Sequence, residues 1–109
     1  MRKVLLKLQS DFVKSPTPTI RIGGLVAFGS IALELDVNIV DFFPDFINSL
    51  LNCVEDNDAK VRYYSSEAMY NIVKSIREKV ADYLERFFYF LCQLFADSDT
   101  DVKKISFCF

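Results

Sequence analysis

Acidic residues cluster in two short segments, and such clusters are candidates for binding calcium. Asp97-Ser98-Asp99-Thr100-Asp101 has oxygen-bearing side chains at the spacing of the first ligands of a calcium loop. That loop also needs glycine at its sixth position and glutamate at its twelfth, where this sequence has Val102 and Cys108. A related segment runs from Asp56 to Glu67 but lacks the glycine. We therefore expect these aspartates to cap helices, and we expect no metal ion and no cofactor.

Residues that support catalysis are scarce. The 109 residues include no histidine, which excludes Ser-His-Asp and Cys-His catalysis and histidine-bound metals. The three cysteines, Cys53, Cys92 and Cys108, show no Cys-x-x-Cys spacing, so neither a disulfide framework nor a zinc site is predicted. We expect Cys53 and Cys92 to be small apolar core residues. The sequence thus predicts no catalytic residues and a reducing, cytoplasmic location.

Three basic residues recur at equal spacing, and each follows an apolar residue that we expect to be buried. The pairs are Ile20-Arg21, Val61-Arg62 and Val102-Lys103. The simplest interpretation is structural, with each cation paired to an aspartate between two helices of its own repeat or a neighbouring one. The alternative is that the cations line one edge of the molecule and recognise a phosphate or an acidic partner.

A stripe of tyrosines and charges is the candidate binding site. Tyr63, Glu67, Tyr70 and Lys74 follow i, i+4, i+7, i+11 spacing, which places them on one face of a helix. Exposed tyrosine with flanking charge favours protein recognition, so these four residues and Arg62 form the predicted partner-binding site. In this interpretation the tyrosines lie outside the core. The alternative is that they pack against the preceding repeat.

A 41-residue repeat positions these residues. Shifting the sequence by 41 positions superposes identical residues without a gap: Asp41/Asp82, Phe46/Phe87, Leu50/Leu91, Asp56/Asp97, Asp58/Asp99, Val61/Val102 and Ser65/Ser106. The same shift relates the first third of the chain to the second. Paired helices with this period are typical of HEAT and armadillo arrays. We therefore predict an all-α fold, an α-solenoid of about three HEAT-type helix pairs. It forms one array over residues 1–109, with repeats at about 1–36, 37–77 and 78–109, the last incomplete.

Apolar residues at helical spacing indicate six helices. We predict them at roughly 2–14, 18–35, 41–55, 59–77, 82–96 and from 100 onward. Asp58 and Asp99 are the expected caps of the fourth and sixth helices. In the first repeat, Thr17 takes this role and Pro18 stands at the first helical position, where its missing amide is tolerated.

Two glycines lie inside the second predicted helix, where each destabilises the helix by ~1 kcal/mol relative to alanine. Gly24 aligns with Ser65 and Ser106, so this position is small in all three repeats. We expect close approach of two helices to explain Gly23-Gly24. The spacing and lysine of a phosphate-binding loop are absent.

The charge balance argues against nucleic-acid binding. Lys and Arg number 13 against 15 Asp and Glu, a net charge of −2. The N-terminal segment is predicted to be an amphipathic helix, because Lys7 interrupts what would be the apolar core of a signal peptide. An alternative function is a basic face that binds a membrane surface or nucleic acid, formed by Arg2, Lys3, Lys7, Lys14 and Arg21. The acidic segments between helices argue against it.

Three segments carry a more specific resemblance. Residues 21–33, 62–74 and 94–103, above all Arg62-Tyr63-Tyr64 followed by Ala-x-Tyr-Asn-Ile-Val-Lys, resemble the N-terminal HEAT repeats of the associated regulators of PIKfyve. The resemblance covers roughly residues 18–104 and implies a non-enzymatic scaffold. Its partner would be the phosphoinositide 5-kinase of the complex that controls phosphatidylinositol 3,5-bisphosphate on endosomal and vacuolar membranes. It also implies peripheral membrane association through that complex, and an oligomer of the parent protein is compatible with it. A HEAT module of another complex, such as a transport receptor or phosphatase scaffold, is the alternative.

The last repeat is predicted to leave apolar surface uncovered. We expect Phe88, Leu91 and Phe95 to face water, because the final helix, with Ile105, Phe107 and Phe109, is too short to cover the helix before it. The sequence therefore predicts a chain that self-associates or folds only in part.

Overall fold

The computed structural model describes residues 2–35, 43–76 and 81–106, and the regular elements in these ranges are all helical. They are α1 (Arg2–Leu8), which continues as a π-helical segment (Gln9–Val13), then α2 (Pro18–Leu35), α3 (Phe43–Cys53), α4 (Ala59–Ile76), α5 (Leu84–Phe95) and α6 (Thr100–Ser106). The all-α fold is confirmed, and the described ends of the helices lie within two residues of the predicted ones. Predicted helical residues 41, 42 and 77, and the apolar residues Phe107 and Phe109, lie outside the described residues.

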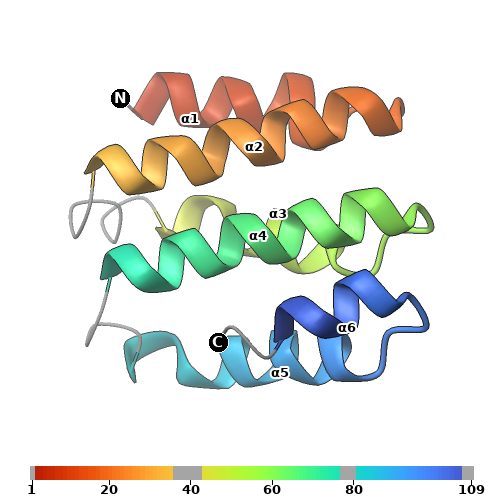
Figure 1. Cartoon of the computed structure of the whole chain (residues 1–109). Helices are drawn as coiled ribbons and strands as arrows, with labels where there is room; N and C mark the ends of the chain where they lie inside the picture. The colour runs from red at the N-terminus through yellow and green to blue at the C-terminus, as the bar shows by residue number, and fades with distance from the viewer. Residues whose placement is uncertain (1, 36–42, 77–80, 107–109) are drawn as a thin grey trace.

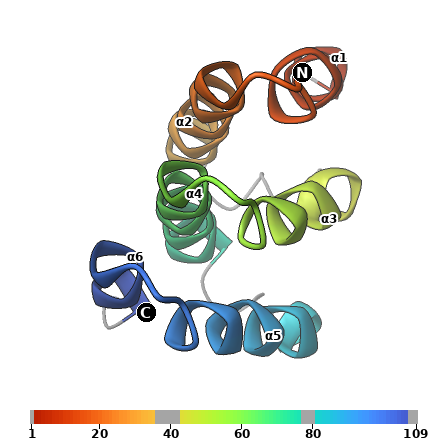
Figure 2. The same cartoon turned by 90° about the vertical axis from the view of Figure 1, so that its right-hand side faces the viewer.

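The helices form two layers. Figure 2 shows α2, α4 and α6 on one side and α1, α3 and α5 on the other. In Figure 1, α4 runs between α2 and α6, and it contacts both of them. Each second helix also contacts the helix that precedes it, α2 with α1, α4 with α3 and α6 with α5. The middle pair therefore has a neighbouring helix pair on each side.

The core lies between the layers and draws apolar side chains from both. The largest fully buried side chains are Leu25, Phe28, Ile47, Leu50, Met69, Ile72, Ile76, Phe90 and Leu94. Removing these side chains from water is the main source of stability for helices of this length. The predicted burial is confirmed for Val61 and Val102, at 0% exposure, but is wrong for Ile20, at 41%. Within the layer formed by α2, α4 and α6, the described structure gives α2 a neighbour, α4, on one side only (Figure 2). Ile20 is therefore exposed.

The ends of the stack expose apolar residues, as predicted for the last pair. Phe88 is 68% exposed and Phe95 is 55% exposed on α5. The prediction is wrong for Leu91, which is half-buried and packs against the core together with Ile105. The helix α6 contacts α5, so even a seven-residue helix covers part of α5.

Aspartate side chains cap the starts of α4 and α6. Asp58 Oδ1 accepts hydrogen bonds from the amides of Lys60 and Val61 at 2.8 and 3.3 Å. Asp99 Oδ1 accepts from Asp101 and Val102 at 2.9 and 3.1 Å. Both predicted caps are confirmed, and each satisfies amides that have no partner within the helix. The acidic segments that resembled calcium loops thus serve as helix starts.

In the first pair, α2 begins at Pro18, as predicted. The carbonyl of Thr17 accepts the first helical hydrogen bonds, from the amides of Ile20 and Arg21, both at 3.1 Å. Ser15 Oγ accepts from the amide of Thr17 at 3.2 Å. The start of α2 is therefore built from different residues than the starts of α4 and α6.

The two glycines of α2 have different surroundings. A Cβ at Gly24 would lie 2.7 Å from Phe12 Cβ and 2.9 Å from Val13 Cγ2, so the π-helical segment packs directly on the glycine. This confirms the predicted close approach at Gly24. A Cβ at Gly23 would have no atom within 4 Å, so close approach within the chain does not explain Gly23.

Candidate functional site

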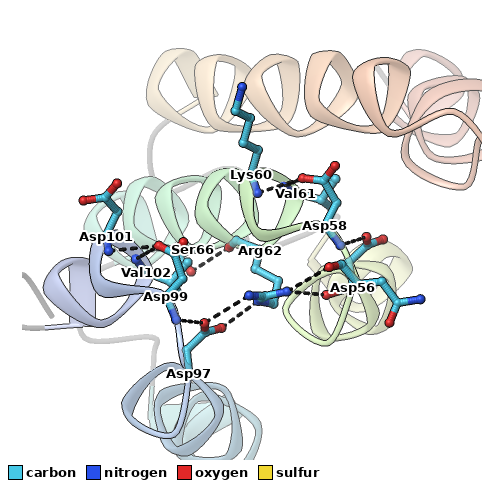
Figure 3. A network of polar contacts seen from close by, with 11 residues as sticks. Asp56, Asp58, Lys60, Val61, Arg62, Ser66, Asp97, Asp99, Asp101 and Val102 are labelled. Carbon is cyan, nitrogen blue, oxygen red and sulfur yellow. Dashed lines mark hydrogen bonds and ion pairs between the residues drawn. The ribbon is translucent and has the colours of Figure 1, made fainter.

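Arg62 joins two segments between helices. Its Nε and Nη2 donate to the Asp97 carboxylate at 2.7 and 3.2 Å, and its Nη1 donates to the carbonyl of Asp56 at 2.9 Å. Arg62 therefore links the start of its own helix, α4, to the segment that precedes α6 (Figure 3). The hydrogen bond that Arg62 donates to the Asp97 carboxylate raises the pKa of Arg62, and the two side chains are only 15% and 5% exposed. Most of the donors of Arg62 are thus used inside the chain.

Arg21 repeats this arrangement one helix pair earlier. Its Nη1 donates to the carbonyl of Ser15 at 2.8 Å, and its Nη2 lies 3.2 Å from Asp56 Oδ1. Its Nε is 3.0 Å from Asp56 Oδ2. The structural interpretation of the basic residues is confirmed for Arg21 and Arg62, each paired with the aspartate of the next helix pair, 35 residues on. Arg21 is therefore engaged within the chain and does not belong to a free basic face.

The tyrosine stripe lies on α4 with graded exposure. Tyr63, Glu67 and Tyr70 are half-buried, and Lys74 is exposed. Tyr63 packs against the core, with its ring edge-on to that of Tyr64 at a centroid distance of 5.4 Å. The expectation that the tyrosines stand outside the core is wrong for Tyr63, which packs against the core, and packing against the preceding repeat stays a prediction. Lys74 Nζ lies 5.7 Å from the centroid of the Tyr70 ring, a cation–π contact at the other end of the stripe.

An open cleft of about 810 Å³ extends this surface from α4 to α6. It is lined by Ala59, Lys60, Tyr63, Tyr64, Asp99, Asp101, Lys104 and Ile105. Aromatic rings form part of its wall, and ammonium and carboxylate groups lie along it, which suits a polypeptide segment better than a reacting small molecule. Sequence reasoning missed the α6 side of the cleft. The 41-residue shift from Tyr63 to Lys104 was the signal that could have found it.

The cysteines differ from each other. Cys53 is buried, as predicted, and burial together with the nearby charge of Asp56 raises its pKa to about 11, so its thiol stays protonated. Cys92 is exposed, so the prediction that it belongs to the core is wrong. Cys92 shares one face of α5 with the exposed Phe88 and Phe95, which lie four residues before it and three residues after it. Cys108 lies outside the described residues.

No group of three or more His, Cys, Asp or Glu side chains in the described residues could hold a metal ion. None of the helices in the same ranges is both long and apolar enough to cross a bilayer.

Comparison with known proteins identifies relatives. Residues 19–108 match the family model described as the Vacuolar 14 Fab1-binding region. The chain is 38% identical over 106 residues to the protein VAC14 homolog of Schizosaccharomyces pombe and 35% identical over 102 residues to that of Arabidopsis thaliana. It is 30% identical over 103 residues to vacuole morphology and inheritance protein 14 of Saccharomyces cerevisiae.

These alignments cover 95%, 94% and 93% of the chain but only 13%, 14% and 12% of the respective relatives. The chain therefore spans about an eighth of the length of the relatives it matches. No solved structure matches the chain. Because the family model covers most of the sequence, the chain belongs to the Vacuolar 14 Fab1-binding region family.

Proposed function

We propose that the chain is part of a non-enzymatic scaffold that binds a Fab1-type phosphoinositide 5-kinase. In this role it helps to hold the complex that controls phosphatidylinositol 3,5-bisphosphate. The observation that carries the proposal is the family match over residues 19–108, a region described as Fab1-binding. The absence of histidine from the sequence and the raised pKa of Cys53 support a binding role rather than a catalytic one.

The accessible part of the predicted site is the proposed contact surface. Tyr70 and Lys74 lie at one end of α4, and the cleft with Tyr63 and Lys104 lies at the other. Glu67 is half-buried between them. We assign Arg62 the role of fixing the relative position of α4 and α6, because its donors are held by Asp97 and Asp56.

The three helix pairs are proposed to be successive HEAT-type repeats of a single array, at about 1–36, 37–77 and 78–109. The recurrence of the Arg–Asp pair at the same separation and the two-layer stacking support this organisation. The proposed location is the cytoplasm, with peripheral association to endosomal or vacuolar membranes through the complex. Such an array binds by surface complementarity along its helices.

Co-purification with a Fab1-type kinase tests the proposal. The double variant Tyr70→Ala/Lys74→Glu is expected to reduce capture of the kinase at least about tenfold, an effect of about 1.4 kcal/mol. Lys14→Glu is the matched control, because Lys14 is also exposed but lies in the segment between α1 and α2. Circular dichroism of each variant must match that of the parent chain. Failure of the parent chain to capture the kinase would contradict the proposed function, and equal capture by all three would contradict only the assigned surface.

A further inference from the structure

The outer face of α2 carries no charged residue between Thr19 and Leu33, and it exposes two large apolar side chains to solvent. The residues that lie along this face, called here the α2 outer stripe, are Thr19, Gly23, Val26, Ser30 and Leu33. All five are exposed, with Val26 at 45% and Leu33 at 51%. The sequence from Ile22 to Leu33 contains no charged residue. A helix that is apolar on all sides is usually covered on all sides.

The neighbouring helix shows a polar version of the same face. The positions 41 residues further on, on α4, hold Lys60, Tyr64, Glu67, Asn71 and Lys74. Val26 thus corresponds to Glu67, and Leu33 corresponds to Lys74. Since the two helices lie side by side (Figure 1), they present corresponding faces of the same layer. The fold therefore accepts charged residues at these positions, and the apolar residues of α2 are not required to form the chain's own core.

Gly23 provides a second, independent observation. Glycine destabilises a helix interior, yet nothing in the chain lies within 4 Å of the Cβ it lacks. Contact with the π-helical segment explains why the adjacent position 24 is glycine, but no such contact explains Gly23. With Ser30 two turns further on, Gly23 leaves the stripe low on either side of Val26. A second helix can therefore approach the α2 backbone closely there.

We propose that the α2 outer stripe is the docking site for an amphipathic helix of a protein partner with acidic residues along one flank. Val26 and Leu33 contact its apolar face, and Gly23 admits its backbone. The acidic flank lies toward α4, where Lys60 and Lys74 are exposed at the two ends and the intervening Glu67 is half-buried. Glu34 is exposed at the end of α2 and would repel an acidic flank. The charge complementarity with the partner helix is therefore limited to the side of the stripe that faces α4. From Thr19 to Leu33 the stripe is about 21 Å long, the length of a helix of about 14 residues.

The inference does not depend on the proposed function, because it specifies the chemistry of a helix and not the kinase. A membrane surface would also suit apolar residues beside lysines. It gives no reason for glycine at position 23, because lipid chains do not require a low backbone. The helix is therefore the occupant that the stripe favours.

Designed peptides test the proposal with the full 109-residue chain. The probe is a labelled 18-residue amphipathic peptide with leucine and alanine on one face and glutamate on one flank. Its control has lysine in place of each glutamate. Fluorescence anisotropy is expected to show at least tenfold tighter binding of the glutamate peptide at low salt, with the preference reduced at high salt.

Two variants locate the binding. Val26→Glu/Leu33→Lys copies the residues of α4 onto α2, so it is expected to keep the helical circular dichroism and to weaken binding of the glutamate peptide at least tenfold. Gly23→Ala is expected to raise the midpoint of thermal unfolding, because alanine is the better helix former and its Cβ enters open space, and yet to weaken binding. This opposition between stability and binding would not arise from a structural role alone.

Three results would overturn the proposal. The first is equal binding of the glutamate peptide to the parent chain and to Val26→Glu/Leu33→Lys. The second is a dimer of the parent chain in sedimentation that this variant abolishes, which would make the stripe a contact between two copies. The third is binding to vesicles of anionic phospholipid that the variant abolishes while neither peptide binds, which would make it a membrane contact.

Discussion

The first helices of the middle and last pairs carry apolar residues at the same repeat positions but bury them very differently. Ile47 on α3 is 0% exposed, whereas Phe88, 41 residues further on α5, is 68% exposed. Val54, just after α3, is 3% exposed, and its counterpart Phe95 is 55% exposed. In Figure 2, α3 lies between α1 and α5, while α5 lies at one end of the stack. Burial in this fold is therefore decided by the neighbouring pairs as much as by the residue itself.

The first pair supports the same conclusion from the other end. Leu6 occupies the position of Ile47 and is 47% exposed, so this position is buried only in the pair that has neighbours on both sides. An apolar residue at this position contributes to stability when a neighbour covers it and forms a sticky surface when none does.

The largest difference in the free energy of unfolding is expected between variants that truncate the corresponding residues Ile47 and Phe88. Ile47→Ala removes part of a fully buried side chain and is expected to lower the free energy of unfolding by about 2–5 kcal/mol. Phe88→Ala is expected to change it by less than about 0.5 kcal/mol, as is usual for exposed positions. Urea unfolding followed by circular dichroism measures both. Similar losses in the two variants would show that α5 is covered in solution.

The next largest effect is expected at the exposed face of α5, where the measured quantity is self-association of the chain. Two exposed phenylalanines at one end of the stack are expected to drive self-association of the 109-residue chain at micromolar concentration. Phe88→Glu/Phe95→Glu is expected to weaken that association at least about 100-fold, or about 2.8 kcal/mol. Sedimentation equilibrium measures the change, with Val4→Glu as a control at the opposite end of the stack. A parent chain that sediments as a stable monomer would contradict this expectation.

These contrasts show which features the sequence could predict. Helical spacing, the caps Asp58 and Asp99, and the small residue Gly24 depend on local chemistry or on one neighbour, and these predictions are confirmed. Cys92 and Ile20 were predicted to be buried because their repeat counterparts have apolar character. Both are exposed, because burial at an end of the stack depends on a neighbour that periodicity assumes.

The candidate site was harder to predict for a related reason. Tyr63 and Arg62 are close together on one helix, but helical spacing alone does not show that Asp97 takes the guanidinium or that Tyr64 packs on Tyr63. The contact of Arg62 with Asp97 joins elements that are 35 residues apart in sequence, and the contact between the neighbouring Tyr63 and Tyr64 depends on how their rings are oriented. The repeat shift relates Asp56 to Asp97, and so it indicated the type of partner but not the particular pairing.

The two described cysteines extend the comparison to pH. The pKa of Cys53 is raised in the folded chain to about 11 from the ordinary 9.0, so the folded state keeps its proton after the unfolded state has lost it. The resulting stabilisation is complete below about pH 9 and is lost as pH rises toward 11, by roughly 2–3 kcal/mol. Urea unfolding at several pH values between 8 and 11 measures the loss. The variant Cys53→Ala is expected to lose less over this range, whereas Cys92→Ala is expected to follow the parent chain. Identical profiles for all three would contradict this assignment.

The smallest expected effect comes from comparing the two Arg–Asp pairs. Arg62 makes a bidentate contact with a carboxylate that is 5% exposed, while Arg21 contacts one that is 16% exposed. Lysine keeps the charge but cannot reproduce the fork, so Arg62→Lys is expected to lower the free energy of unfolding by about 1.5–2 kcal/mol. Arg21→Lys is expected to lower it by about half as much, because water screens the pair around Asp56 more effectively. Urea unfolding at 0.05 and 1 M salt separates the two, since the more exposed pair is the more sensitive to screening. If both variants lose the same stability with the same salt dependence, the lower exposure of Asp97 does not strengthen its pairing with Arg62, and the two Arg–Asp contacts are equivalent links between neighbouring helix pairs.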